Sequence, residues 1–319
     1  MQPVLNDSLS LVVPVYGNEA SIDALLKAIA SIRQQCAGGF EAVFVVDGSP
    51  DRSYALLHER LPQAGFPSQL ISLSRNFGAF SAIRVGLEKA RGSVIAVMAA
   101  DLQEPPELVL GFYDALKNQG HDVAFGVREG RSDPWPSKLA SNAFWSLYRR
   151  LVMRDIPKGG VDIFAVTARF RDRLLALGES NTSLLAQLFW LGGRRSFIGY
   201  ERRSREHGKS AWTLRKKLRY LSDSIFAFTD LPVRLLIALG AIAMLLAIVL
   251  SIVTLAAKLS GLVPVPGYTG TMLTVLFFGA FNSLALGVVG TYAWRAFENT
   301  KGRPLAVIQS EETFNEGPP

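Results

Sequence analysis

The stretch that decides the fold is VIAVMAADLQEPPE, residues 94–107. Its first five residues are apolar and favour a buried strand, which runs into Asp101, Gln103 and Glu104. Ligands bind at the carboxyl ends of strands in open α/β sheets, so these side chains are candidate ligand contacts. Their oxygens suit a hard cation such as Mg2+ or Mn2+, and such a cation can clamp a diphosphate. An ordinary strand-to-helix turn, in which the two prolines open the next helix, explains the same residues equally well.

Strand and helix patterns alternate on both sides of this stretch. Short apolar, β-branched runs alternate with segments that carry apolar residues at helical spacing. The alternation predicts an α/β fold with a doubly wound, mostly parallel sheet, whose strand ends bring polar residues to one edge. The expected strands are 9–16, 42–46, 68–73, 94–98, 122–127, 163–167 and 195–200, and the expected helices are 20–35, 53–61, 79–90, 107–119, 137–152, 170–177 and 183–191.

The first strand is followed by YGNEAS, which contains neither a G-x-G-x-x-G fingerprint nor a P-loop. A bound nucleotide would therefore be held by carboxylates and a metal. Asp47, after the second strand, could accept the imide N–H of a uracil or pair with ribose hydroxyls. Asp, Gly, Ser and Pro are also turn residues, so a simple turn remains an alternative for DGSP at 47–50.

An arginine pair and an aspartate follow two later strands. Arg128 and Arg131 present two guanidinium groups, which suit phosphate oxygens. Asp162 follows two glycines, which allow the backbone to approach a ligand closely, so it is the candidate carboxylate beside an acceptor. A solvated surface for the arginines and a turn or cap for Asp162 remain open.

Two apolar runs near the C-terminus, 233–257 and 271–294, contribute most of the mean hydropathy of +0.22. Each has about the length needed to cross a bilayer as a helix. The net charge is +7, and basic residues cluster before the first run and after the second, while the loop between them carries only Lys258. By the positive-inside rule both flanks are cytoplasmic. This placement favours a membrane, and not nucleic acid, as the reason for the basic charge.

The lone Cys36 excludes an intrachain disulfide, and the first residues lack the pattern of a secretory signal. We expect a cytoplasmic α/β domain tethered by membrane helices, with both termini in the cytoplasm. The polar tail at 309–319 is expected to be disordered. The expected domains are 1–210 for the α/β domain, 211–232 for amphipathic interfacial helices, 233–296 for two transmembrane helices at about 233–257 and 271–294, and 297–319 for a cytoplasmic tail.

Seven motifs in order resemble one family across nearly the whole chain. They are PVYGNE, VDGSPD, LSRNFGAFSA, ADLQEPPEL, R-x-x-R, GGVDIF and Y-x-R-x-x-R-x-x-G-x-S. Together they resemble the family 2 glycosyltransferases, whose GT-A fold is Rossmann-like with a mostly parallel sheet. The branch that looks most similar is the polyprenyl-phosphate glycosyltransferases, which include dolichol-phosphate mannose synthase-like enzymes and bacterial undecaprenyl-phosphate glucosyltransferases. Two membrane helices and the closing GRPL at 302–305 are similar to the bacterial members, which implies the inner membrane.

The resemblance implies inverting transfer of a sugar from a nucleotide-sugar, expected to be a UDP-sugar, to polyprenyl (undecaprenyl) phosphate. It also implies an Mg2+ or Mn2+ cofactor and is compatible with a homo-oligomer. The acceptor phosphate is already ionised at neutral pH, so positioning and electrostatics should supply most of the acceleration. The roles implied by position are nucleotide-sugar binding by Pro14, Tyr16, Glu19, Asp47, Asn76 and Asp101, metal binding by Asp101 and Gln103, catalysis by Asp101 and Asp162, and acceptor-phosphate binding by Arg128, Arg131, Arg202, Arg205 and Ser210.

The chain departs from the family pattern at three places. Ala99 replaces the first acid of an Asp-x-Asp motif, Val46 replaces an acid that often precedes Asp47, and Ala211-Trp212 follow Ser210 where the family has Lys-Tyr. The loss at Ala99 favours one alternative, a catalytically weak, membrane-anchored scaffold protein. A glycosyltransferase with another lipid acceptor is a further alternative.

Overall fold

The computed structural model describes residues 5–130, 145–157, 160–179, 182–202, 214–260 and 267–315. The chain forms two compact units. One unit is Met1–Lys217 together with Arg303–Pro319, and the other is Leu218–Gly302. The candidate site lies in the first unit.

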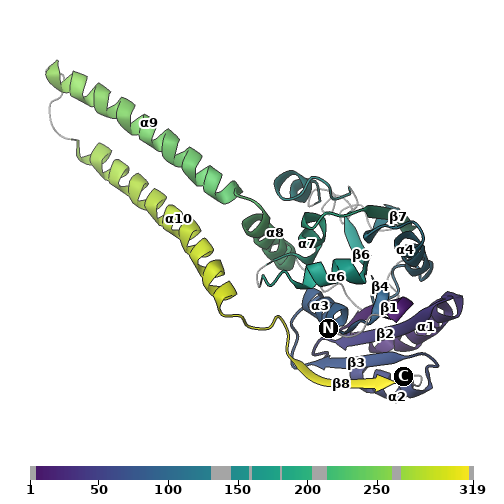
Figure 1. Cartoon of the computed structure of the whole chain (residues 1–319). Coiled ribbons are helices and arrows are strands. Elements are labelled where there is room, and N and C mark those ends of the chain that lie inside the picture. The colour runs from purple at the N-terminus through teal and green to yellow at the C-terminus, as the bar shows by residue number, and fades with distance from the viewer. Residues whose placement is uncertain are drawn as a thin grey trace. The chain divides into compact units, whose positions relative to one another are not determined.

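The first unit is built on an eight-stranded sheet in the order β7-β5-β6-β4-β1-β2-β3-β8 (Figure 1). Neighbours are parallel except where β6 pairs with β4 and β5 and where β8 pairs with β3. The predicted mostly parallel α/β sheet is therefore confirmed. The strands are β1 (Leu5–Val15), β2 (Gly39–Val46), β3 (Ser68–Leu73), β4 (Gly92–Val97), β5 (Val123–Gly130), β6 (Val161–Thr167), β7 (Arg195–Glu201) and β8 (Ile308–Phe314).

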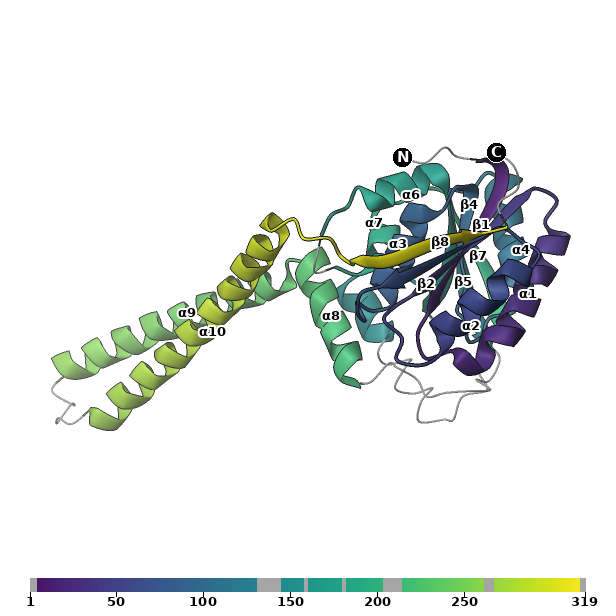
Figure 2. The same cartoon turned by 90° about the horizontal axis from the view of Figure 1, so that it is seen from below.

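Helices cover both faces of this sheet, and Figure 2 shows the two layers on either side of it. The apolar stripe of α1 buries Ile22, Leu25, Ile29 and Ile32 against alternate residues of β1. The central strands are buried on both faces, which explains their nearly continuous apolar runs. The helices on one face are α1 (Ile22–Gln35), α2 (Ser53–Arg60) and α4 (Glu107–Lys117), and those on the other are α3 (Ala79–Lys89), α6 (Ala168–Leu175) and α7 (Leu184–Trp190).

Polar side chains near the amino ends of the parallel strands bond to one another. Glu41 of β2 is buried, and its Oε1 accepts hydrogen bonds from the Ser10 hydroxyl (2.5 Å) and the Arg91 amide (2.6 Å). Its Oε2 accepts from Nε2 of Gln69 in β3 (3.0 Å). One buried carboxylate thus links three strands. A buried acid is stable in the interior only when it has such hydrogen-bond partners.

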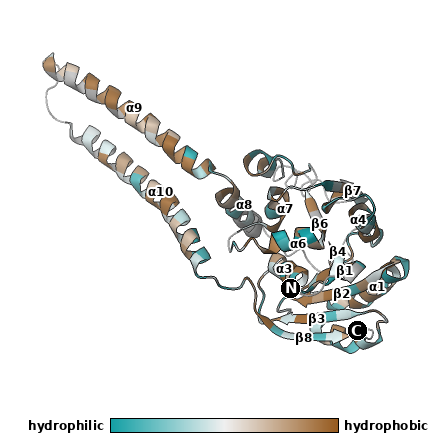
Figure 3. Cartoon of the chain, in the orientation of Figure 1, coloured by the Kyte–Doolittle hydropathy of each residue, from teal (hydrophilic) through white to brown (hydrophobic). Residues whose placement is uncertain are grey.

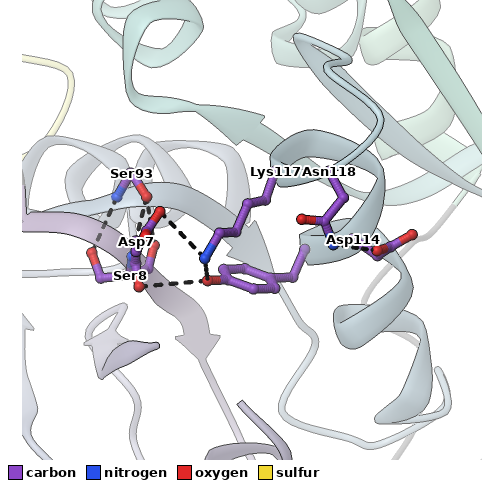
Figure 4. Close-up of polar contacts among 7 residues, drawn as sticks. Asp7, Ser8, Ser93, Asp114, Lys117 and Asn118 are labelled. Atoms are coloured by element: carbon purple, nitrogen blue, oxygen red, sulfur yellow. Dashed lines mark hydrogen bonds and ion pairs between the residues drawn. The ribbon is translucent and has the colours of Figure 1, made fainter. Parts of the chain in front are cut away.

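A second set of contacts at the same end joins β1 to β4 and α4 (Figure 4). The Ser8 amide donates to Ser93 Oγ (3.1 Å), and the Ser93 amide donates to Ser8 Oγ (3.3 Å). Lys117 at the end of α4 lies 3.2 Å from the carboxylate of Asp7. These contacts tie the entry of β1 to its neighbours.

The expectation of a disordered tail is wrong, because residues Ile308–Phe314 form β8 along the free edge of β3. The Tyr54 hydroxyl donates to Glu312 Oε1 (2.8 Å), and His58 Nε2 lies 3.0 Å from Glu312 Oε2. Lys89 pairs with Glu311. The backbone N–H and C=O groups along the edge of β3 provide the ladder partners of β8, and the two glutamates on the new edge discourage further pairing.

The second unit consists of the end of α8 (Leu214–Phe228), α9 (Leu231–Leu259) and α10 (Tyr268–Thr300). Arg295 of α10 donates to Asp223 of α8 (2.7 Å) and its guanidinium lies over the Phe226 ring. Within the described residues one stretch, Leu231–Leu250 of α9, is long and apolar enough to cross a membrane. Figure 3 shows α9 as mostly hydrophobic and α10 as mixed. The helix at 268–300 is present, but the predicted second membrane span is not confirmed.

Candidate functional site

Asp101 and Gln103 follow β4 in a turn of uncommon backbone geometry. Leu102 between them has φ +53°, a left-handed conformation that costs a non-glycine residue about 1 kcal/mol. The Gln103 amide lies 3.4 Å from Asp101 Oδ1, and the Ser21 hydroxyl donates to the Ala100 carbonyl (3.0 Å). Such strain persists only where neighbouring structure holds it, and it is common at functional sites.

Arg202, at the end of β7, contacts this turn. Its Nη2 donates to Oε1 of Gln103 at 2.5 Å, although the two residues are 99 positions apart in the chain. Gln103 is buried, and Arg202 is half-buried. A guanidinium donor makes the bond charge-assisted. The family resemblance assigns Gln103 to the metal and Arg202 to the acceptor phosphate, whereas in the structure the two side chains contact each other.

The turn fits a divalent cation that is shared with a substrate. Asp101 and Gln103 offer oxygen donors, which hard cations prefer. Among the described residues no group of three or more His, Cys, Asp or Glu side chains could hold a metal. Mg2+ commonly uses one or two carboxylates and takes its other ligands from water and substrate phosphates. Asp101 and Gln103 therefore suit a cation that binds together with a diphosphate. Two protein donors alone give the cation little affinity.

The loops after β1 and β2 are joined by side chains from the second loop. The Ser49 hydroxyl accepts from the Gly17 amide (2.8 Å) and donates to Asp51 Oδ1 (2.6 Å), and Asp51 Oδ2 accepts from the Glu19 amide (3.0 Å). Glu19 in return accepts from the Arg52 amide (3.0 Å). Burial alone would raise the pKa of Asp51, but the hydrogen bonds from Ser49, Glu19 and Ser53 outweigh it and lower that pKa below its usual value.

Asp47 at the end of β2 connects to the loop after β3. It is only 2% exposed, and its two oxygens accept from the amides of Phe77 (2.7 Å) and Gly78 (2.8 Å). Burial raises the pKa of Asp47, although these two hydrogen bonds and the charge of Arg75 oppose the rise. Asp47 thus holds the loop at 75–78 in place.

Several predicted nucleotide contacts are open to solvent at this edge. Tyr16 is 46% exposed, Glu19 and Asn76 are exposed, and Pro14 is half-buried. We call the strand-end segments 16–19, 47–51, 75–78 and 101–104 the carboxyl-end rim. It is the predicted edge of the sheet, and the sheet order places all four segments there.

The predicted acceptor residues approach the same edge from β5 and β6. The strand register pairs Val127 of β5 with Val161 of β6, and Arg128 with Tyr200 of β7. Arg128 and the backbone of Asp162 therefore lie near the strand end that carries Arg202. Arg131, Arg205 and Ser210 fall outside the described residues, as does the side chain of Asp162.

Two features of the rim were not predicted from the sequence. The Arg202–Gln103 contact has no local signal, because it depends on the packing of distant strands. Ser49 and Asp51 were visible within VDGSPD, and their known tendency to bond nearby backbone amides could have identified them as loop anchors.

The profile of one family, Glycosyl transferase family 2, matches residues 10–176, which is more than half of the chain. The chain is 30% identical over 314 residues to undecaprenyl-phosphate 4-deoxy-4-formamido-L-arabinose transferase of Edwardsiella ictaluri, covering 97% of this chain and 95% of the relative. It is 31% identical over 304 residues to the uncharacterized glycosyltransferase YkcC of Bacillus subtilis, covering 94% and 93%.

Among solved structures, a similar fold occurs in glucosyl-3-phosphoglycerate synthase from Mycobacterium tuberculosis, crystallised with Mn2+, uridine diphosphate and glucosyl-3-phosphoglycerate. The identity is 18% and the TM-score 0.47, over 69% of this chain and 77% of that chain. Because this family match spans more than half of the chain, the chain is a glycosyltransferase and belongs to glycosyl transferase family 2.

Proposed function

We propose that this protein transfers a sugar from a nucleotide-sugar, a UDP-sugar by our inference, to polyprenyl (undecaprenyl) phosphate. The observation that carries the proposal is that Arg202, after β7, contacts Gln103 in the turn that also holds Asp101, after β4, at one edge of the sheet. Carboxylate and amide oxygens suit a cation on a diphosphate, and the guanidinium suits phosphate oxygens. The named activity of the Edwardsiella ictaluri relative, which aligns over nearly the whole chain, supports the choice of acceptor.

In the proposed reaction an oxygen of the lipid phosphate attacks the anomeric carbon of the sugar. The new carbon–oxygen bond forms as the bond to the nucleoside diphosphate breaks, with inversion, and the electron pair leaves with the diphosphate. Side chains of the protein orient the acceptor phosphate against the donor. The acceptor phosphate is held by Arg128, Arg131, Arg202 and Arg205, and Asp162 lies beside the anomeric carbon that is transferred. A bound Mg2+ or Mn2+, held by Asp101 and Gln103, would supply charge neutralisation on the departing diphosphate.

We also propose that the catalytic unit is tethered to the cytoplasmic face of the inner membrane. Leu231–Leu250 of α9 supplies one span and α10 a second, with both ends of the chain in the cytoplasm. The basic residues on both flanks of this pair support the orientation. A homo-oligomer remains compatible with this arrangement.

A catalytically weak scaffold is the second candidate, because Ala99 removes one carboxylate from the turn. To decide between the two, purified full-length protein is incubated with undecaprenyl phosphate, Mg2+ or Mn2+, and a panel of nucleotide-sugars. Mass spectrometry of the lipids should detect a lipid-phosphate sugar with at least one donor. In a parallel set of reactions another lipid replaces undecaprenyl phosphate. Absence of product from every donor in both sets would favour the scaffold, and product only in the second set would change the acceptor.

A further inference from the structure

The bond between Arg202 and Gln103 engages the atom that the proposed metal site needs. A guanidinium only donates hydrogen bonds, so the atom that it meets at 2.5 Å is the Oε1 of Gln103. The same Oε1 is the atom that would bind a cation, because the side-chain nitrogen of glutamine is itself a donor. Arg202 and the proposed cation therefore share one oxygen.

The two positive charges at this oxygen oppose each other. Oε1 has two lone pairs, so it has room for both partners, and charge decides whether both stay. A cation bound about 2.1 Å from Oε1 would lie at most about 4.6 Å from Nη2 of Arg202, which is 2.5 Å from the same oxygen. Gln103 is 8% exposed and Arg202 is half-buried, so water screens the repulsion only weakly.

The Arg202 guanidinium has a further donor that is not satisfied in this position. Its Nε is buried and has no hydrogen-bond partner within the described part of the chain. A buried N–H without an acceptor costs free energy, and phosphate oxygens are acceptors that suit a guanidinium well. The position that Arg202 takes against Gln103 is therefore one that a nearby phosphate would improve on.

We infer that Arg202 and the divalent cation compete for Gln103, so that binding of the cation releases the Arg202 guanidinium toward a phosphate. This inference rests on the proposed metal and phosphate ligands. The phosphate belongs to the donor diphosphate or to the lipid acceptor, which present the same kind of oxygen. The opposite role has the opposite sign: if Arg202 held Gln103 ready for the cation, loss of Arg202 would weaken cation binding.

The test measures Mn2+ binding to the full-length protein in detergent by electron paramagnetic resonance, without nucleotide. Arg202→Met keeps an unbranched apolar stem and removes the guanidinium, and we expect it to tighten Mn2+ binding at least threefold. Arg194→Met is the matched control, because the Arg194 side chain is 72% exposed, and its Mn2+ affinity should stay within twofold of wild type. In a Gln103→Ala background, Arg202→Met should change Mn2+ affinity less than twofold, because the shared oxygen is gone.

Modification of arginines by phenylglyoxal, mapped by mass spectrometry, gives a second measurement that follows Arg202 itself. Mn2+ should speed modification of Arg202 at least threefold in the wild type but not in Gln103→Ala, and it should leave Arg194 unchanged. With Mn2+ present, UDP and farnesyl phosphate are then added separately. Protection of Arg202 by one of them identifies the phosphate that it binds.

The outcomes separate the competition from the metal site on which it rests. Weaker Mn2+ binding in Arg202→Met, tightening that persists in the Gln103→Ala background, or modification that Mn2+ does not speed would each overturn the competition alone. Protection by neither phosphate would overturn the release of Arg202 toward a phosphate. Wild-type Mn2+ affinity in Asp101→Asn would place the cation elsewhere and overturn the proposed metal site itself.

Discussion

The two ends of the parallel strands use polar residues in opposite ways. At the amino end, Glu41 is buried among Ser10, Gln69 and the Arg91 amide, and each of its oxygens has a partner within the protein. At the carboxyl-end rim, Tyr16 and Asn76 are exposed, and Asp101 lies in a turn with a left-handed Leu102.

A closed set of hydrogen bonds stabilises the fold, whereas exposed polar side chains such as Tyr16, Glu19 and Asn76 are accessible to a ligand. Residues within the rim also differ from one another. Asp47 and Asp51 accept several hydrogen bonds from the protein, as Glu41 does at the amino end. Substitutions at the amino end should therefore change stability, and substitutions at the open part of the rim should change activity.

The largest effect is expected at Asp101, in the carboxyl-end rim, and at Asp162, near the start of β6. Asp101→Asn and Asp162→Asn should each reduce lipid-linked sugar formation about 100-fold or more, because each removes a charge that the proposed mechanism places beside the reacting groups. Thermal unfolding in detergent should stay close to wild type. Asp114→Asn, on the exposed surface of α4, is the matched control and should keep full activity. Full activity in Asp101→Asn would remove that residue from the site.

Substitution of Glu41 at the amino end should change stability and leave activity unchanged. Glu41→Ala leaves the Ser10, Gln69 and Arg91 donors without their acceptor in the interior, which should lower the free energy of unfolding by about 3 kcal/mol. Activity per folded molecule should be retained. Glu59→Ala on the exposed face of α2 removes the same charge and should leave stability within about 0.5 kcal/mol. Equal stability of the two variants would contradict the structural role of Glu41.

Ala99→Asp adds a carboxylate next to Asp101 at the carboxyl-end rim. A second acidic oxygen beside Asp101 should tighten Mn2+ binding about tenfold, equivalent to about 1.4 kcal/mol, as measured by electron paramagnetic resonance without nucleotide. Asp101→Asn in the same background should reverse the gain. An unchanged Mn2+ affinity in Ala99→Asp would place the cation elsewhere.

The smallest effect concerns the pH dependence of Asp51. Its pKa is lower in the folded protein than the ordinary value of 3.8, so its contribution to stability is present above pH 3.8 and is lost as the pH falls through the folded pKa. Asp51→Asn should therefore melt below wild type at pH 7, and the gap should narrow below pH 3.8. A gap that stays constant from pH 7 to pH 3 would show that ionisation of Asp51 contributes nothing.

Much of the fold follows from local pattern: β3 at 68–73 matches its predicted range, and β4 at 92–97 begins two residues before the predicted 94–98. Buried parallel strands are continuous apolar runs, and that pattern is readable without knowing their neighbours. The C-terminal strand β8 was missed because IQSEETF is polar and forms a strand only where the edge of β3 offers partners. The second membrane span is a prediction that α10 leaves unconfirmed.

By itself the sequence determined the alternation of strands and helices and the polar strand ends, because both depend on residue type and spacing, while the missing acid at Ala99 follows from the resemblance to the family. Only the tertiary structure decided what the polar groups touch. It joined Arg202 to Gln103 across 99 residues, and it turned Asp47 inward to the amides of the loop at 75–78. A hydrogen bond depends on distance and direction at the scale of an ångström, and packing of remote elements sets both.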